Sequence, residues 1–466
     1  MQKDPKHSRT DDYNNTLTFD FPSIKIGIAE HDNGPTGVTV FYFPEGALAV
    51  VDVRGGSPGA VNTPALSGGS NQKNLTALVF AGGSDYGLSA QGGVADAIKS
   101  ETHQDHVMDY GRAIAGAVIY DLGARRYKYN THEEYYNLGK QAIQSVESGK
   151  FPLGAYGAGR LAVQGSFFGD CQPSGQGAAV TEVMVNGKKV KIGVFTVVNS
   201  IGSIVDKQNN VVRPNHPDEE KINIHDRLSE FEKNYIPASI INTRKNTTLT
   251  LVVTNLFLNN YELNRLAIQV HASMARVIQP FNTFEDGDIL YAVSTQEVNS
   301  GKNKIDDIPI IGTVASRLAW DAVLSSVPKT SDLIARSAIE PINLEANSVS
   351  CYVGEYKLSE ITTAQITLNG NKLYLSTSGE LGENNFGQSS YYLDHEAKTA
   401  LIPVDLDEFV YDAAPDLDVK EEERTYYRCK FSFFNSGSNQ FDQLTLNPGK
   451  RAQIANRIQT ATLTCS

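Results

Sequence analysis

The segment from residue 24 to residue 345 alternates strand-like and helix-like stretches, and this alternation constrains the fold more than any other feature of the chain. The strand-like stretches are short apolar and β-branched runs with many glycines nearby: GVTVFYF, ALAVVDVR, LTALVFAGG, EVMVNGKKVKIGVFTVV, TLTLVVTN and DILYAVST. Inside the fourth run, Asn186-Gly187 is a hairpin signal. Strands mixed with helices predict an α/β or α+β fold built in layers.

Two of the intervening stretches have helical periodicity. YELNRLAIQVHASMARVIQP places apolar side chains on one face, and Pro280 is expected to end the helix. A second helix is expected in GTVASRLAWDAVLSSV, from Gly312. The apolar face of the first consists of Leu263, Leu266, Ala267, Val270, Met274 and Val277.

The length and a change of composition predict the domain organisation. A chain of 466 residues is expected to form roughly two to three domains. From Cys351 onward the sequence is strand-like and rich in Tyr, Thr and Asn, with an Asn369-Gly370 hairpin in ITLNGNKLYL. We therefore expect an N-terminal extension (1–23), a large domain (24–345) and a small β-rich C-terminal domain (351–466).

The charge balance restricts the partners. The formal net charge of -12 and the pI of about 5.3 argue against nucleic acid or anionic lipid, because no basic surplus is available to neutralise phosphates. The sequence contains no uncharged apolar run of about 18 residues and therefore predicts no membrane span. Small molecules and neutral polymers remain as partners.

The compartment is predicted from the cysteines. The N-terminal stretch MQKDPKHSRTDDYNNT lacks the apolar segment of a signal peptide, although a chain whose leader had been removed would look the same. Three cysteines, Cys351, Cys429 and Cys465, lie in the C-terminal region, and the fourth is Cys171. This distribution favours an oxidising compartment and one disulfide, so we expect a periplasmic or secreted protein, with a cytoplasmic one as the alternative.

No metal or cofactor is expected. The cysteines form no C-x-x-C pair, and His103, Asp105 and His106 lack the i, i+4 spacing of a zinc-binding helix. The glycines of GAYGAGR do not have the order of a dinucleotide fingerprint, and the sequence contains no phosphate loop.

A serine-hydrolase elbow is almost present, but the pattern fails. G-x-S-x-G requires a glycine two residues after the serine, and in Gly82-Gly83-Ser84-Asp85 the next residue is Tyr86. The glycines are better explained by close packing of the backbone.

The strand-like run TLTLVVT begins with a polar pair, Asn246-Thr247, instead of a turn. A hydroxyl at Thr247 could attack the carbonyl of Asn246, form an ester by an N-to-O shift and release a new N-terminus after hydrolysis. The free α-amine of Thr247, with a pKa near ~8, could then serve as the base for its own hydroxyl. The alternative is an ordinary threonine-rich start of a strand.

Two further features fit such a site. Asp286-Gly287-Asp288 places two carboxylates at the start of a strand, where they could orient an ammonium or a hydroxyl. Asn199 ends the strand KIGVFTVVN, and its amide could stabilise an oxyanion, an effect worth ~3 kcal/mol in the transition state. Solvated loop acids and a turn-opening asparagine are the alternatives.

Taken together, these residues resemble a known family. The segments GPTGVTVFYFPEGALAVVDVRGGSPGAVNTPAL, VFAGGSDYGLSAQGGV, GAVIYDLGARR, FPLGAYGAGR, VVNSIG, NTTLTLVVTN and FEDGDILYA, in this order, resemble the self-processing amidohydrolases. That family comprises the D-aminopeptidases/esterases, the β-peptidyl aminopeptidases and the nylon-oligomer (6-aminohexanoate-oligomer) endohydrolases, and the chain looks closest to the last branch. The resemblance covers about residues 24–345.

The resemblance implies a four-layer αββα sandwich, cleavage between Asn246 and Thr247, and Thr247 as the nucleophile. It further implies that Asn199 lies on the oxyanion side and that Asp286 and Asp288 orient the nucleophile, without a cofactor. A small peptide or amide oligomer would be the substrate, and the protein would be a homo-oligomer of processed heterodimers.

The sequence departs from this family in one respect. Related enzymes have an assisting lysine in the glycine-rich segment before the oxyanion strand, but GSFFGDCQPSGQGAA contains none, and Lys188, Lys189 and Lys191 come later. Despite this departure, the sequence as a whole predicts an N-terminal threonine hydrolase of short peptides or ω-amino-acid oligomers. The alternatives are an aminopeptidase/esterase with a D- or β-residue preference and a processed, non-catalytic binding protein.

Overall fold

The computed structural model divides the chain into two units. One comprises residues 1–121 and 130–329, the other residues 122–129 and 330–466. The residues that the structure describes are 15–31, 36–67, 74–102, 113–121, 131–168, 172–212, 222–233, 246–301, 307–329, 352–357, 363–370, 372–378, 399–405, 408–412, 428–434, 443–446 and 453–458.

The strands of the first unit are β1 (Thr16–Thr18), β2 (Lys25–His31), β3 (Thr36–Val53), β4 (Ala60–Val61), β5 (Leu75–Ala81), β6 (Ala113–Val118), β7 (Lys150–Pro152), β8 (Val163–Gln164), β9 (Gln172–Pro173), β10 (Gln176–Val185), β11 (Lys188–Asn199), β12 (Ser203–Ile204), β13 (Thr247–Leu256), β14 (Ile278–Gln279) and β15 (Ile289–Val298). Its α-helices are α1 (Ala90–Thr102), α2 (His132–Gln144), α3 (Ile224–Lys233), α5 (Asn260–Ser273) and α6 (Asp307–Ser325). Its 3-10 helices are η1 (Thr63–Leu66), η2 (Ser84–Ser89), η4 (Gly157–Gly159), η5 (Ser166–Phe168) and η6 (Met274–Arg276).

The long strand β3 belongs to two sheets. Its first half pairs with β2 on one side and β5 on the other, and its second half pairs with β15. One continuous hydrogen-bonded path runs through both sheets in the order β10-β11-β13-β15-β3-β5-β6-β4, and β2 also pairs with β3. The pairs β13/β15 and β5/β6 are parallel, and the other pairs in this order are antiparallel.

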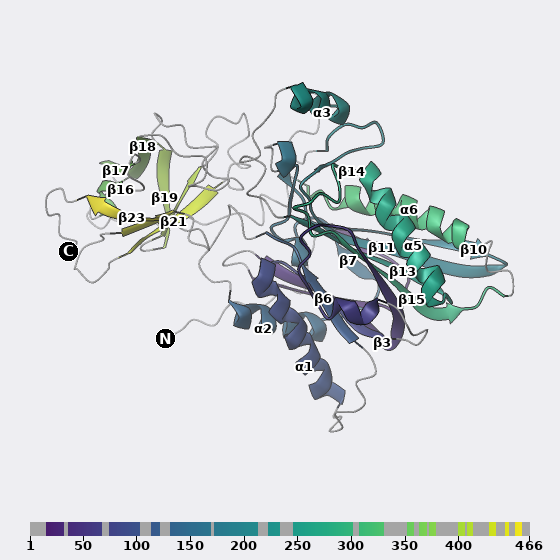
Figure 1. Ribbon diagram of the computed structural model, residues 1–466. Coiled ribbons are helices and arrows are strands. Elements are labelled where there is room, and N and C mark those ends of the chain that lie inside the picture. The colour runs from purple at the N-terminus through teal and green to yellow at the C-terminus, as the bar shows by residue number, and fades with distance from the viewer. Residues whose placement is uncertain are drawn as a thin grey trace. The chain divides into compact units, whose positions relative to one another are not determined.

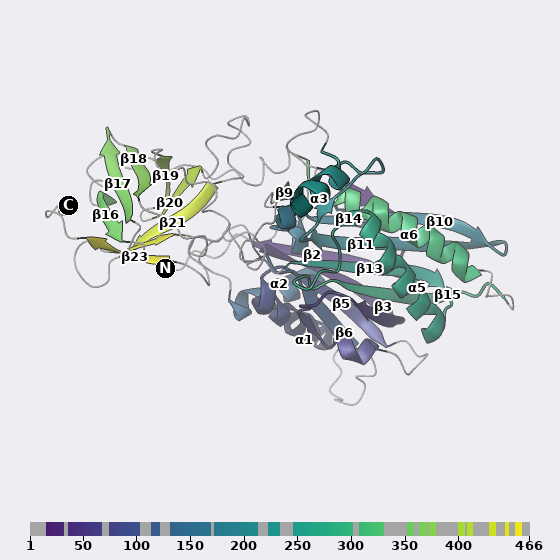
Figure 2. The ribbon, with the colours of Figure 1, turned by 45° about the horizontal axis from the view of Figure 1, so that its top comes forward.

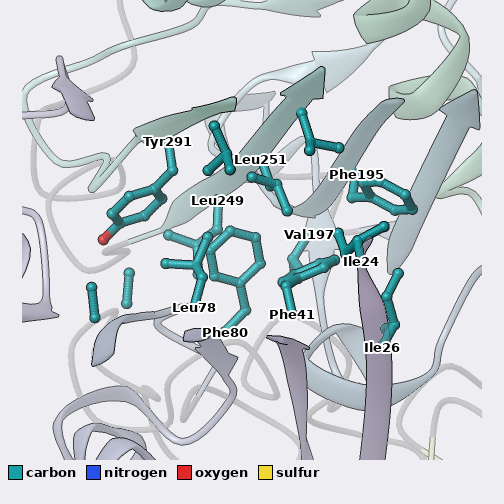
Figure 3. Close-up of a cluster of buried hydrophobic side chains, with 14 of the residues drawn as sticks. Ile24, Ile26, Phe41, Leu78, Phe80, Phe195, Val197, Leu249, Leu251 and Tyr291 are labelled. Atoms are coloured by element: carbon teal, nitrogen blue, oxygen red, sulfur yellow. The ribbon is translucent and has the colours of Figure 1, made fainter. Parts of the chain in front are cut away.

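The two sheets stack face to face, and helices cover both outer faces (Figure 1). Between the sheets lies an aromatic and aliphatic core, which Figure 3 shows: Phe41 and Phe80 come from one sheet, and Phe195, Leu251 and Tyr291 from the other. Helices α1 and α2 pack on the sheet of β2 and β5, and α5 and α6 pack on the sheet of β11 and β13. The predicted α+β class is confirmed, and the layers follow the order αββα.

Helix α5 illustrates how the sequence produces a layer. Asn259 accepts a hydrogen bond from the backbone of Glu262, whose side chain accepts one from the backbone of Asn259, so a capping box starts the helix. All six residues of its predicted apolar face pack in the core between this helix, α6 and the sheet. The α-helix ends at Ser273, before Pro280, and the residues between them include η6 and β14.

Three other expectations need adjustment. The runs GVTVFYF and ALAVVDVR form one strand, β3, instead of two. Helix α6 begins at Asp307, before the expected Gly312. The described part of the expected N-terminal extension packs into the first unit: β1 pairs with β7, and Phe21 is buried in the core between the sheets, because its aromatic ring gains by leaving water.

Among the described helices, α6 is long and apolar enough to cross a membrane by length and composition alone. Its window Ile308–Ser325 has a mean hydropathy of 1.2 and includes Arg317 and Asp321. The helix packs against β10 and β11, and Ala315, Ala319 and Val323 are buried there. Its apolar character is thus accounted for by the core.

The second unit contains a closed antiparallel barrel of eight strands (Figure 2). In β17, Ala364 and Ile366 are buried while Gln365 between them is exposed, which is the period-two pattern of a strand with one inward face. The predicted Asn369-Gly370 hairpin joins β17 to β18. The strands are β16 (Gly354–Lys357), β17 (Thr363–Asn369), β18 (Lys372–Ser378), β19 (Thr399–Asp405), β20 (Glu408–Asp412), β21 (Arg428–Phe434), β22 (Gln443–Leu446) and β23 (Gln453–Ile458).

Candidate active site

The Asn246-Thr247 junction lies at the start of β13, a strand whose ten residues are all buried. Asn246 and Thr247 are themselves only 4% and 2% exposed. β13 is central in its sheet, with β11 on one side and β15 on the other, and Thr247 is the register partner of Asn199. The polar start of the strand is therefore inside the protein, where each polar atom needs a partner.

The carbonyl oxygen of Asn246 has two donors. The Thr247 hydroxyl Oγ1 donates to it at 2.6 Å, and the backbone N–H of Gly287 donates to it at 2.8 Å. Two donors on one carbonyl withdraw electron density from its carbon. The hydroxyl that could attack the peptide bond and an N–H that could stabilise the resulting oxyanion thus converge on the same peptide group.

The Asp286 carboxylate faces the loop after β11. Its Oδ1 accepts from the backbone N–H of Ile201 at 3.3 Å. Its Oδ2 accepts from the Thr283 hydroxyl at 2.9 Å and from the Thr283 N–H at 3.3 Å. Asp286 also forms an isolated bridge with Asn246, so the two backbones are adjacent.

The Asp288 carboxylate holds the start of β13. Its Oδ1 accepts from the N–H of Thr248 at 2.7 Å, and its Oδ2 from the N–H of Asn282 at 3.1 Å. The acid pair is therefore connected to the residues on either side of Thr247. Asp288 accepts from the backbone of Thr248, and the backbone of Asp286 is bridged to that of Asn246. Neither carboxylate accepts a hydrogen bond from the Thr247 hydroxyl, which in this uncleaved chain donates to the carbonyl of Asn246.

Burial sets the ionisation of the pair. Burial raises the pKa of Asp286 to about 6, although the bonds from Thr283 and Ile201 favour the charged form. Burial and the adjacent Asp286 charge raise the pKa of Asp288 well above its usual value. Two buried carboxylates without a cation resist carrying two negative charges, so a positive group created beside them would be stabilised.

Asn199 is the last residue of β11 and is fully buried. Its Oδ1 accepts from the N–H of Val163 at 3.0 Å, and its Nδ2 donates to the carbonyl of Tyr120 at 2.9 Å. These two bonds fix which way the amide points. The structure thus brings together Asn199, Asn246, Thr247, Asp286 and Asp288 from three separate parts of the sequence.

Gly287 is required by a close approach rather than by a left-handed backbone. A Cβ on Gly287 would lie 2.5 Å from the Thr247 hydroxyl and 2.7 Å from the carbonyl oxygen of Ser57. The sequence analysis assigned no role to the Gly287 N–H and so missed it as a donor. Thr283 was missed as well, although a threonine three residues before an aspartate is a common local hydrogen-bonding pattern.

The three later lysines are held elsewhere. Lys188 donates to the carbonyl of Asn299, Lys189 pairs with Glu182, and Lys191 pairs with Asp20. Lys191, the nearest of them along β11, is eight residues from Asn199, which corresponds to roughly 26 Å of strand. None of the three takes the place of the absent family lysine in this arrangement.

Ser84 of the incomplete elbow forms no hydrogen bond with Asn199, Asn246, Thr247, Asp286 or Asp288. Ser84 has a left-handed backbone (φ 53°) at the start of η2, and its buried Oγ makes no hydrogen bond to any residue that the structure describes. A Cβ on Gly83 would meet the Tyr135 ring at 1.9 Å, which agrees with close packing as the role of these glycines.

Two sequence predictions lie outside the described residues. The cluster His103, Asp105 and His106 is one of them, and the predicted disulfide is the other, since the side chains of all four cysteines fall there. Within the described ranges, no group of three or more His, Cys, Asp or Glu side chains could hold a metal ion.

Comparison with known proteins identifies the class. The family model of peptidase family S58 matches residues 15–344. The 6-aminohexanoate-oligomer endohydrolase of Paenarthrobacter ureafaciens is 37% identical over 321 residues, which cover 66% of this chain and 85% of that protein. An uncharacterized aminopeptidase of Mycobacterium leprae is 29% identical over 332 residues, covering 67% and 84%.

A solved structure also aligns with the chain. It is the L-aminopeptidase D-Ala-esterase/amidase from Ochrobactrum anthropi, described as a variant of the Ntn hydrolase fold. Its TM-score is 0.48 at 16% identity, over 65% of this chain and 83% of that one.

This protein is an amide-bond hydrolase. It belongs to peptidase family S58, so the family resemblance in the sequence is confirmed. The expectation of an enzyme, as opposed to a non-catalytic binding protein, is confirmed with it.

Proposed function

We propose that this chain cleaves itself between Asn246 and Thr247 and then works as an N-terminal threonine hydrolase of amide bonds. The observation that carries the proposal is the pair of donors on the Asn246 carbonyl, the Thr247 hydroxyl at 2.6 Å and the Gly287 N–H at 2.8 Å. An ordinary strand start has no need to bury a hydroxyl against its own preceding carbonyl beside two carboxylates.

Self-cleavage would proceed through an ester. Thr247 Oγ1 attacks the carbonyl carbon of Asn246, and the Gly287 N–H donates to the oxyanion that forms. The C–N bond breaks, the Thr247 nitrogen takes up the proton that the hydroxyl has lost, and the Asn246 acyl group is left on Oγ1. The α-amine of Thr247 is free from this point, and water then hydrolyses the ester, which releases the Asn246 carboxylate and regenerates the Thr247 hydroxyl.

Turnover would use the groups that cleavage exposes. The α-amine of Thr247, with an ordinary pKa near ~8, accepts the proton of its own hydroxyl as Oγ1 attacks a substrate amide. It gives this proton to the leaving amine as the C–N bond breaks, and water then hydrolyses the acyl ester on Oγ1 and restores the hydroxyl. We propose that the Asn199 amide, whose orientation is fixed by its bonds to Val163 and Tyr120, stabilises the oxyanion with its second N–H. Asp286 and Asp288 then hold the Thr247 ammonium, whose positive charge favours their ionised forms, which burial alone disfavours.

The two fragments would stay together after cleavage. β11 belongs to the first fragment and β13 to the second, and they are paired over eight register positions from Ile192/Thr254 to Asn199/Thr247. Separation would unpair this ladder and expose the apolar faces of both strands. We propose a processed heterodimer as the basic unit, which assembles further into a homo-oligomer.

The proposed substrates are short peptides or ω-amino-acid oligomers. The relative from Paenarthrobacter ureafaciens is named for an activity on 6-aminohexanoate oligomers, and this chain is 37% identical to it over 321 residues. The aminopeptidase name of the mycobacterial relative keeps a second candidate, an aminopeptidase/esterase with a D- or β-residue preference. Hydrolysis of matched oligomers with free and acetylated N-termini distinguishes them, because an aminopeptidase requires the free amine.

A denaturing gel with N-terminal sequencing tests the proposal. We expect two fragments, residues 1–246 and residues 247–466, that coelute on a sizing column under native conditions. A single intact chain that still hydrolyses amide substrates would overturn the assignment of Thr247.

A further inference from the structure

The segment DVRGGS, residues 52–57, comprises the last two residues of β3 and the four that follow, and it has no role in the chemistry described above. It lies directly against the loop that carries the acid pair. Arg54 and Gly55 donate their backbone N–H groups to the carbonyl of Asp288 at 3.1 and 3.2 Å. Ser57 donates to the carbonyl of Asp286 at 2.8 Å, and Gly56 to that of Thr283 at 3.3 Å.

Only glycines fit at the centre of this contact. A Cβ on Gly55 would lie 2.2 Å from the backbone nitrogen of Asp288, and one on Gly56 would lie 2.2 Å from the carbonyl oxygen of Phe284. Backbone atoms cannot move aside as the end of a flexible side chain can. The two backbones are therefore in direct contact along residues 54–57 and 283–288, and the first segment determines where the carbonyls of the second lie.

A charged network anchors residues 54–57 from behind. Asp52 Oδ2 lies 2.6 Å from Arg54 Nε and 2.9 Å from Nδ1 of His271, which is on α5. Arg54 also donates to the carbonyl of Ile268, one turn before His271 on the same helix. Asp52, Arg54 and His271 thus tie the end of β3 to α5.

The charge states suit this arrangement. Burial lowers the pKa of His271, so its imidazole is neutral and carries the Nδ1 hydrogen that Asp52 accepts. Burial alone would raise the pKa of Asp52, but hydrogen bonds from His271 and Arg54 hold it below its usual value. The His271 side chain is only 1% exposed, so its hydrogen bond to Asp52 lies in the protein interior.

His271 also contacts the chain just before the acid loop, at Phe281. Its ring packs edge-on against Phe281, with centroids 5.7 Å apart. Phe281 directly precedes Asn282, whose N–H donates to Oδ2 of Asp288. His271 therefore contacts Asp52, which anchors residues 54–57, and Phe281, which leads into the acid loop, without touching the two carboxylates.

We propose that residues 54–57 form a backbone clamp, anchored by Asp52, Arg54 and His271, that positions Asp286 and Asp288 for self-cleavage. The role of the two acids rests on the proposed function, and His271 and Asp52 are positioning residues that act through the clamp. An ångström of displacement at a catalytic group can lower a rate by roughly 100-fold, so a rigid support for the acid loop has a direct effect on cleavage.

Two substitutions of one residue test the clamp. Asn places an amide N–H close to the position of His Nδ1, so His271→Asn retains the donor to Asp52, whereas His271→Leu removes it. Both variants lose the ring contact with Phe281, so the comparison isolates the hydrogen bond. Lys191→Met, which breaks the Lys191–Asp20 ion pair on β11, is the matched control for loss of a polar pair elsewhere.

Each variant is synthesised in a cell-free system as the full chain, and the rate constant for self-cleavage is measured on a gel time course. Hydrogen exchange of residues 282–288 is measured on the same proteins. We expect His271→Leu to cleave roughly 10- to 100-fold more slowly and to exchange faster in this loop, while His271→Asn and Lys191→Met stay close to wild type.

A His271→Leu protein that melts at lower temperature but keeps wild-type cleavage and wild-type exchange in 282–288 would overturn the proposal, because the network would then only support α5. If the wild-type chain itself remains uncleaved, the proposed function fails while the exchange measurement still decides the clamp.

Discussion

The hydroxyl oxygen of Thr247 lies 2.6 Å from the carbonyl oxygen of Asn246, its own preceding residue. Both residues are buried at the start of a central strand, and the peptide bond between them is the one that would have to break. The relationship makes Thr247 the first residue to test.

Replacing Thr247, the proposed nucleophile, separates cleavage from folding. Thr247→Ala should remain one intact chain without hydrolase activity, because the attacking hydroxyl is gone. Thr247→Ser should still cleave and retain turnover, since only the methyl group is lost. Gel analysis and an amide-hydrolysis assay measure both; activity in the alanine variant would show that another residue is the nucleophile.

The acid pair is tested by isosteric substitution. Asp286→Asn and Asp288→Asn should lower self-cleavage and turnover together, by roughly 100-fold if the nucleophile or the Thr247 amine moves by an ångström. Each change also turns one acceptor oxygen into a donor that faces a backbone N–H, so a loss of about 1–3 kcal/mol in stability is expected alongside.

Initial rates on the folded fraction and melting temperatures, measured on the same samples, distinguish the two effects. A large loss of melting temperature with normal turnover of the surviving enzyme would assign the pair a structural role only.

The pH dependence of stability follows from the raised pKa of Asp286. Burial raises this pKa from 3.8 to about 6, so the folded chain binds the proton more tightly than the unfolded chain does. Its contribution to stability is therefore complete below the unfolded pKa and is lost as the pH rises through about 6. The uncleaved Thr247→Ala protein should lose stability over this range, and adding Asp286→Asn should flatten the loss. Denaturant midpoints of the two proteins between about pH 4 and pH 7 measure the difference, which should change with pH rather than stay constant.

Gly287 should tolerate no side chain. In Gly287→Ala the new Cβ would lie 2.5 Å from the Thr247 hydroxyl, and we expect cleavage to slow by roughly 100-fold as the hydroxyl or the Gly287 N–H is displaced. Gly92→Ala in α1 is the control, because its Cβ would meet nothing closer than 3.7 Å. Equal cleavage rates in the two variants would contradict the role of Gly287.

The C-terminal region should be dispensable for self-cleavage. All residues of the candidate site lie in the first unit, before residue 330. A chain that lacks residues 351–466 should therefore still cleave itself at Asn246-Thr247, as seen on a denaturing gel. A soluble truncation that remains uncleaved would show that the β-rich domain takes part in forming the site.

Much of the fold could be predicted from the sequence because it depends on local patterns. The period-two and helical repeats specified which runs become strands and helices, and Asn186-Gly187 produced the expected hairpin with both residues at positive φ (48° and 74°). The apolar face of α5 is buried as its spacing predicted. The break between GVTVFYF and ALAVVDVR was misplaced, because Pro44-Glu45-Gly46 between them continues as one strand when two sheets share it.

By itself the sequence determined the layered α+β class, the family and the residue types of the site, since these depend on the order of side chains along the chain. Only the tertiary structure decided how the site is assembled. The Gly287 N–H on the Asn246 carbonyl joins residues 41 positions apart, and the backbone donors to Asp286 and Asp288 come from Ile201, Thr248 and their own loop. A backbone N–H is the same in every residue except proline, so its role as a donor leaves no mark in the sequence. The raised pKa values of the two acids likewise come from burial, which is a property of the folded protein.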